Sequence, residues 1–116
     1  MEFSSDFKYD LKVGQVAEKE LASVFQDKKI EVKTDLQAHK TGNVYVEYFS
    51  RGKPSGISTS ESEFYCFALG SVFVLIESKE LKEKCRKYLN TSRDKKGGDN
   101  NTSKGILLPI KDLINQ

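Results

Sequence analysis

The sequence predicts an α/β protein in which a small mixed β-sheet is flanked by helices. Three patterns point to this class. Residues 11–26 place apolar side chains at helical spacing, residues 28–35 and 44–49 have the composition and alternation of β-strands, and residues 71–77 form the short continuous apolar run typical of a buried strand. A chain of 116 residues suits one domain, spanning residues 1–116, whose core needs no disulfide or metal.

The first half of the chain begins with the helix expected over residues 11–26. The segment KKIEVKTD, residues 28–35, alternates polar and apolar side chains and predicts a strand that ends at a turn. Residues 36–43 are ambiguous, and we interpret them as a short strand followed by a Thr-Gly-Asn turn.

The segment VYVEYF, residues 44–49, is rich in strong β-formers and predicts the next strand. Because side chains alternate along a strand, two faces are expected. One face carries Val44, Val46 and Tyr48, and the other carries Tyr45, Glu47 and Phe49. The segment SRGKPSG, residues 50–56, predicts a turn.

A second helix is expected to begin at Ser58, Thr59 or Ser60 and to run to about residue 69, where Gly70 ends it. The run SVFVLIE, residues 71–77, then predicts a buried central strand.

The last third of the chain predicts one further helix and one further strand. Residues 78–90 are amphipathic and predict the helix, and the polar residues 91–104 predict a mobile loop. The segment GILLPI, residues 105–110, predicts an edge strand because it contains Pro109, and a terminal helical turn follows it.

Composition narrows the class of protein. There is no apolar run near 18 residues and the N-terminus is polar and acidic, so we expect no membrane span and no signal peptide. Cys66 and Cys85 have no metal-binding spacing and are expected to be reduced thiols of a cytoplasmic protein. The net charge of +2 is too small to establish a nucleic-acid partner by itself.

Acidic residues suggest a candidate metal site. Asp35 stands where the first predicted strand turns, and Glu47 lies in the next strand, so the two carboxylates would converge if these strands paired. Glu18 or Glu20, from the first helix, could reach the same place. Three carboxylates and water form the oxygen cage that Mg²⁺ prefers, although solvated charge is the ordinary interpretation of acidic residues.

Several segments resemble one nuclease family. GQVAEKELASVF is similar to the opening helix of archaeal-type Holliday-junction resolvases, and TDLQAHKTGNVYVE to the core of the wider PD-(D/E)XK superfamily. SVFVLIE and GILLPIKDL resemble later elements of the same resolvases.

The resemblance implies a restriction-endonuclease-like αβββαβ core, a homodimer, and Mg²⁺-dependent cleavage of branched or duplex DNA, with Mn²⁺ as a substitute metal. Residue by residue, it implies that Glu18, Asp35 and Glu47 hold the metal and that Asp35 and Glu47 are catalytic. A viral member would act in the host cytoplasm.

This sequence departs from the family where the motif lysine is expected, because Phe49 stands there. Lys33, on the same strand face as Asp35, is the first candidate to replace that lysine, and Lys53 is the second. Arg51 and Lys53, in a Gly-containing basic turn, are expected to contact DNA phosphates.

Three functions therefore remain open. The first is a structure-selective endonuclease, the second is a weak or inactive nucleic-acid-binding module on the same fold, and the third is an interaction protein that uses its sheet edge. His39 is the only histidine in the chain, and without a partner group it is assigned no catalytic role.

Overall fold

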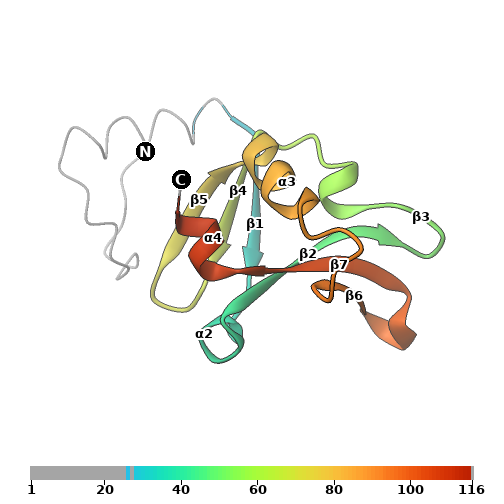
Figure 1. Ribbon diagram of the computed structural model, residues 1–116. Coiled ribbons are helices and arrows are strands. Elements are labelled where there is room, and N and C mark those ends of the chain that lie inside the picture. Colours follow the sequence, from blue (N-terminus) through green and yellow to red (C-terminus); the bar gives the residue numbers. More distant parts are fainter. Residues whose placement is uncertain (1–25, 27, 116) are drawn as a thin grey trace.

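The computed structural model, in which Gln26 and residues 28–115 are described, has an α/β architecture with two small sheets and a few helices (Figure 1). The α/β class predicted from the sequence is confirmed. The first sheet has the strand order β1-β4-β5, with β1 parallel to β4 and β4 antiparallel to β5. Its strands are β1 (Ile30–Thr34), β4 (Phe64–Ala68) and β5 (Phe73–Glu77).

The second sheet is antiparallel throughout and has the order β3-β2-β7-β6. Its strands are β2 (Asn43–Ser50), β3 (Lys53–Pro54), β6 (Asp94–Gly97) and β7 (Ser103–Pro109). Figure 1 shows that its strands run in a clearly different direction from those of the first sheet.

The described helices are short. They are α2 (Ala38–Thr41), α3 (Ser78–Arg86) and α4 (Ile110–Ile114), with 3-10 turns η1 (Gly56–Ser58) and η2 (Asp99–Asn101). The helix α3 contacts β4 and β5 of the first sheet and β7 of the second, so it joins the two sheets (Figure 1).

The core is a single cluster built from both sheets and from α3. In the second sheet, Val44 pairs with Leu108 and Val46 with Ile106, and all four side chains are buried. Leu81 of α3 is fully buried against the same cluster. The pattern that predicted Val44 and Val46 on an apolar face is therefore confirmed.

One predicted helix is wrong. Residues 64–68 form β4 in the middle of the first sheet, where a helix over residues 58–69 was expected. The segment FYCFA is rich in aromatic side chains that suit a strand packed on both faces. The Ser60 hydroxyl bonds Glu31 and Ser62, so this expected capping residue binds other side chains.

Strand positions were also misjudged. Among the described strands, β5 has β4 as its one neighbour and lies at the edge of the sheet, whereas β7 lies between β2 and β6 and is central. Pro109 is compatible with a central strand because it is the last residue of β7.

Two further predictions are wrong. Residues 94–97, expected in a mobile loop, form β6, and residues 38–41, within the segment interpreted as a strand and turn, form α2. The expected strands at 28–35 and 44–49 and the expected helix beginning at residue 78 are confirmed. The expected helix over residues 11–26 falls, except for Gln26, outside the described residues.

Candidate functional site

Asp35 and Glu47 were expected to converge through pairing of their strands, and that pairing is wrong. β1 pairs with β4, whereas β2 pairs with β3 and β7, so the two residues belong to different sheets. The Asp35 backbone N–H donates to Ala68 O at 2.9 Å, and its carboxylate accepts a hydrogen bond from the Gln37 backbone N–H at 3.0 Å. In this structure the Asp35 side chain stabilises the turn between β1 and α2.

Packing of the two sheets nevertheless brings Lys33 and Glu47 together. Both line a cavity of about 220 Å³ between the sheets, which we call the inter-sheet cavity. Its lining includes Lys33, Tyr45, Glu47, Gly56, Tyr65 and Phe67. Two of the three predicted catalytic residues therefore face one space, although they come from separate sheets.

Lys33 forms an ion pair with Glu31, a residue that the sequence interpretation missed. The β1–β4 register places Glu31 beside Tyr65 and Lys33 beside Phe67, and alternation puts all four on one face. Lys33 Nζ lies 3.3 Å from Glu31 Oε2, and these side chains are 51% and 37% exposed. Ser60 Oγ donates to Glu31 Oε1 at 3.2 Å.

The signal for Glu31 was present in the sequence. Glu31 and Lys33 are separated by one residue, as are the acidic residue and the lysine in the motif of the nucleases that the sequence resembles. At the position where that motif was expected, Phe49 stands two residues after Glu47 in place of the lysine. Lys33, from the neighbouring sheet, lines the same cavity as Glu47, so its replacement of the motif lysine stays a prediction.

Glu47 is held by the segment that follows the β2–β3 hairpin. Ser55 Oγ donates to Glu47 Oε2 at 2.9 Å, which fixes the carboxylate. Gly56 has φ +52°, and a Cβ there would lie 2.2 Å from Glu47 O. Only glycine allows this approach of η1 to β2, so the SGI segment positions Glu47 against the cavity.

Tyr65 contributes a buried hydroxyl without a hydrogen-bond partner in the described part of the chain. Burial is the largest cause that raises the pKa of Tyr65 from 10.0; interaction with the Ser60 hydroxyl lowers it, Glu31 raises it and the charge of Lys33 lowers it. The Ser60 hydroxyl is close to the phenol but does not reach hydrogen-bond geometry with it, because it interacts with Glu31 and Ser62. The phenol is therefore protonated at neutral pH and able to donate a hydrogen bond.

Phe49 does not share a face with Glu47 as expected. A β-bulge shifts the register of β2 against β7 between these residues, so that Glu47 pairs with Gly105 and Phe49 with Lys104. Lys104 is two residues from Ile106, so it lies on the face that carries the core side chains, and Phe49 lies there with it. The bulge therefore turns Phe49 away from the face of Glu47.

Phe49 belongs instead to a row of residues in cross-strand register. Lys96 pairs with Lys104, Lys104 with Phe49, and Phe49 with Pro54. We call Lys96, Lys104 and Phe49 the basic row. Both lysines are exposed, and neither forms an ion pair within the described residues.

Arg51 and Lys53, the predicted phosphate contacts, lie at the tip of the β2–β3 hairpin. Arg51 and Gly52 have φ values of +51° and +82°, the combination that a two-residue type I′ turn requires. The Arg51 backbone N–H donates to Thr102 O at 2.9 Å, which holds the tip against the β7 side. Both basic side chains are exposed, so their contact with DNA stays a prediction.

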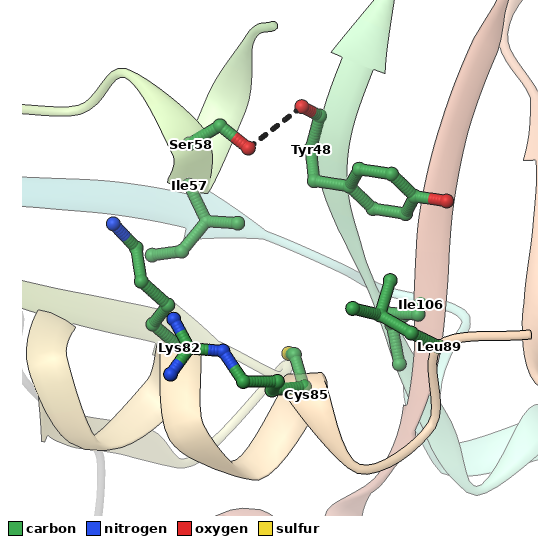
Figure 2. A pocket seen from close by; sticks show the side chains of 8 residues that line it. Tyr48, Ile57, Ser58, Lys82, Cys85, Leu89 and Ile106 are labelled. Carbon is green, nitrogen blue, oxygen red and sulfur yellow. Dashed lines mark hydrogen bonds between the residues drawn. The ribbon is translucent and has the colours of Figure 1, made fainter.

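A second cavity, of about 280 Å³, lies between α3 and the second sheet (Figure 2). We call it the α3 cavity; its lining includes Tyr48, Ile57, Ser58, Lys82, Leu89 and Ile106. Lys82 extends from α3 alongside it, and Ser58 Oγ donates to Tyr48 O at 2.8 Å (Figure 2). Tyr48 Oη donates to Asp94 Oδ1 at 2.6 Å.

The two cysteines are not reactive groups. Both are free and buried. Burial raises the pKa of Cys85, which lines the α3 cavity, to about 12, and burial also raises the pKa of Cys66. Both thiols therefore stay protonated at neutral pH, which agrees with structural roles.

Metal ligands are incomplete in the part of the chain that is described. Within it, no group of three or more His, Cys, Asp or Glu side chains is placed to hold a metal ion. Glu18 and Glu20, the predicted helix ligands, lie outside the described residues. His39 is exposed in α2.

None of the helices described here has both the length and the apolar character needed to cross a lipid bilayer. Comparison of the chain with protein-family models, with curated proteins and with solved structures finds no match.

Proposed function

We propose that this protein is a metal-dependent endonuclease that acts on branched or duplex DNA through the inter-sheet cavity. The observation that carries the proposal is the meeting of Lys33 and Glu47 in that cavity, with Glu31 paired to Lys33. A lysine beside fixed carboxylates is an arrangement that can bind a metal and handle protons in phosphodiester hydrolysis.

Each residue has a distinct role in this proposal. Glu47, oriented by Ser55, and Glu31, oriented by Ser60, supply carboxylate oxygens of the type that Mg²⁺ or Mn²⁺ prefers. Lys33 is placed to orient a water molecule or to stabilise developing negative charge.

Glu47, which lines the cavity, and Glu31, which pairs with Lys33, fit a magnesium site only in part, because a third protein oxygen is needed to resemble the site of the nucleases. Asp35, two residues after Lys33, and Glu18 remain the candidates for it. Such a metal, when bound, supplies an activated hydroxide and charge neutralisation.

DNA would be held by the exposed cations of the second sheet. Arg51 and Lys53 at the hairpin tip directly follow the strand that carries Glu47, so phosphates contacted there would lie on the chain segment leading to the cavity. Lys96 and Lys104 add positive charge on the same sheet. A symmetric homodimer is also part of the proposal, because the resemblance to Holliday-junction resolvases implies one.

A cleavage assay tests the proposal directly. The full chain is incubated with labelled linear, flapped and four-way DNA in Mg²⁺, in Mn²⁺ and in chelator, beside the variant Glu47→Gln. Cleavage is expected with either metal and is expected to disappear in chelator and in the variant. Cleavage by Glu47→Gln at the wild-type rate would remove the inter-sheet cavity from the mechanism.

A nucleic-acid-binding module without cleavage is the second candidate. It is favoured by the incomplete carboxylate set in the described residues and by the engagement of Asp35 in the turn after β1. DNA binding that depends on Arg51 and Lys53, with no cleavage of any substrate in Mg²⁺ or Mn²⁺, would support this second candidate instead.

A further inference from the structure

The Tyr65 hydroxyl is a polar group at the inter-sheet cavity that forms no hydrogen bond with any of the described residues. Tyr65 is only 2% exposed, and its hydroxyl is buried without a hydrogen bond in the described structure. By contrast, the hydroxyl of Tyr45, in the same cavity, interacts with Ser103 Oγ at 3.0 Å. A buried hydroxyl left unpaired is costly, so a group that enters the cavity and accepts its hydrogen bond is favoured.

The walls around this hydroxyl define the chemistry of what could enter. The rings of Tyr65 and Phe67 stack with centroids 6.0 Å apart and an interplanar angle of 27°, and Tyr45 adds a third aromatic residue. Flat aromatic ligands suit such walls. The carboxylate of Glu47 accepts hydrogen bonds, whereas Lys33 and Tyr65 donate them, so a ring with both donors and acceptors on its edge fits best.

The size of the cavity restricts the ligand further. At about 220 Å³ it is smaller than the cavities of 300–1,000 Å³ that hold drug-sized molecules. One ring system fits this space better than a dinucleotide or a folded peptide.

We propose that the inter-sheet cavity receives one unpaired nucleobase, with Tyr65 donating to an acceptor on its edge and Glu47 accepting from a ring or amino N–H. This inference rests on the nucleic-acid substrate proposed above and adds a preference for DNA with an unstacked base. Bases in single strands and at branch points can leave the stack with less loss of pairing than bases in a duplex. The preference for branched over linear duplex DNA would follow.

The test compares three fluorescein-labelled 12-nucleotide ligands by anisotropy, at one salt concentration and without divalent metal. They are a single strand, the same strand with abasic sites at its central positions, and a duplex. The single strand is expected to bind about tenfold more tightly than the abasic strand, which has the same backbone charge.

Two matched variants assign the effect to one hydroxyl. Tyr65→Phe removes the unpaired hydroxyl and is expected to reduce single-strand affinity about tenfold, to lose the difference from the abasic strand, and to keep the melting temperature or raise it. Tyr48→Phe removes the hydroxyl that donates to Asp94, from a residue that lines the other cavity, so it is expected to lower the melting temperature and to keep the affinity.

The outcomes separate this inference from the proposed function. Equal binding of the intact and abasic strands, with DNA affinity retained, would overturn the nucleobase site and leave the DNA-acting function standing. Unchanged affinity in Tyr65→Phe would also overturn it, because the hydroxyl would then contribute nothing to binding of the single strand. Absence of binding to every ligand would overturn both.

Discussion

The two cavities differ more in their chemistry than in their size. The α3 cavity is the larger, at about 280 Å³ against about 220 Å³. It combines apolar side chains from η1, β7 and the segment after α3 with the bonded hydroxyls of Tyr48 and Ser58 and with the exposed cations Lys82 and Arg86 of α3. The inter-sheet cavity combines a lysine, a fixed carboxylate and an unpaired phenol.

This contrast makes the inter-sheet cavity the better candidate for a functional site. Bonded hydroxyls and exposed, hydrated cations offer a ligand little direction beyond apolar contact, whereas a buried donor beside an oriented carboxylate provides direction and specificity. We therefore expect substitutions in the inter-sheet cavity to affect chemistry and those in the α3 cavity to affect stability.

The largest expected effect comes from Lys33. Lys33→Met should reduce the rate of DNA cleavage by about a hundred- to ten-thousand-fold, because it removes the cation beside Glu31 while keeping an unbranched side chain. Lys82→Met is the matched control at the α3 cavity and should cleave normally. Single-turnover rates in Mg²⁺ measure both. Equal losses in the two variants would break the contrast between the cavities.

Ile106→Ala shortens an apolar side chain that lines the α3 cavity. Ile106 is 1% exposed at the centre of the core, so its truncation is expected to reduce the free energy of unfolding by about 2–5 kcal/mol. Urea unfolding measures this loss. The cleavage rate per folded molecule, measured well below the unfolding midpoint, should stay near the wild-type value. A selective loss of cleavage in a stable variant would assign the α3 cavity a functional role.

The Tyr48–Asp94 hydrogen bond should make the stability of the α3 side depend on pH. Burial alone would raise the pKa of Asp94, but hydrogen bonds from the Asn90 backbone N–H and from Tyr48, together with Lys104, lower it below 3.8. A carboxyl with a depressed pKa in the folded state stabilises the protein above about pH 3.8, and that stabilisation is lost as the pH falls through the folded-state value.

Tyr48→Phe is therefore expected to cost about 1.5–3 kcal/mol at pH 7, the range for hydrogen bonds to charged groups. The difference from the wild type should shrink as the pH falls below the ordinary pKa of aspartate. Unfolding titrations at pH 7, 5 and 3 measure it. A difference that stays constant over this range would mean that Asp94 is not the partner that matters.

The smallest effect is expected from the hairpin tip. Replacing Arg51 and Lys53 with alanine should weaken DNA binding for all sequences and reduce the slope of log K against log salt by about one unit for each lost phosphate contact. Anisotropy titrations at several salt concentrations measure the slope. A loss confined to one DNA sequence would indicate base contacts instead.

The sequence predicted the fold class and part of the candidate site, and the reasons for its failures are physical. Lys33 and Glu47 were identified as strand residues of one site, and they do face one cavity, but through packing of two sheets and not through strand pairing. Alternation along one strand does not reveal which strand will be its neighbour.

Tyr65 could not have been found from the same patterns. It lies in a segment of aromatic residues whose flanking serines and glutamates suggested a capped helix, and only tertiary pairing with β1 and β5 makes it a strand. Likewise, β6 contains charged residues and glycine, and it is a strand because β7 provides its partner.

The bulge in β2 also limits the effect of replacing Phe49 with the lysine of the nuclease motif that the sequence resembles. A lysine introduced at position 49 would project on the face of Lys96 and Lys104 and would not approach the Glu47 carboxylate. Phe49→Lys would thus lengthen a stripe of positive charge, with a gain in non-specific attraction to any polyanion and a repulsive cost among three adjacent cations. Position 49 is in this sense a control on surface charge, whereas the lysine of the proposed site lies on β1.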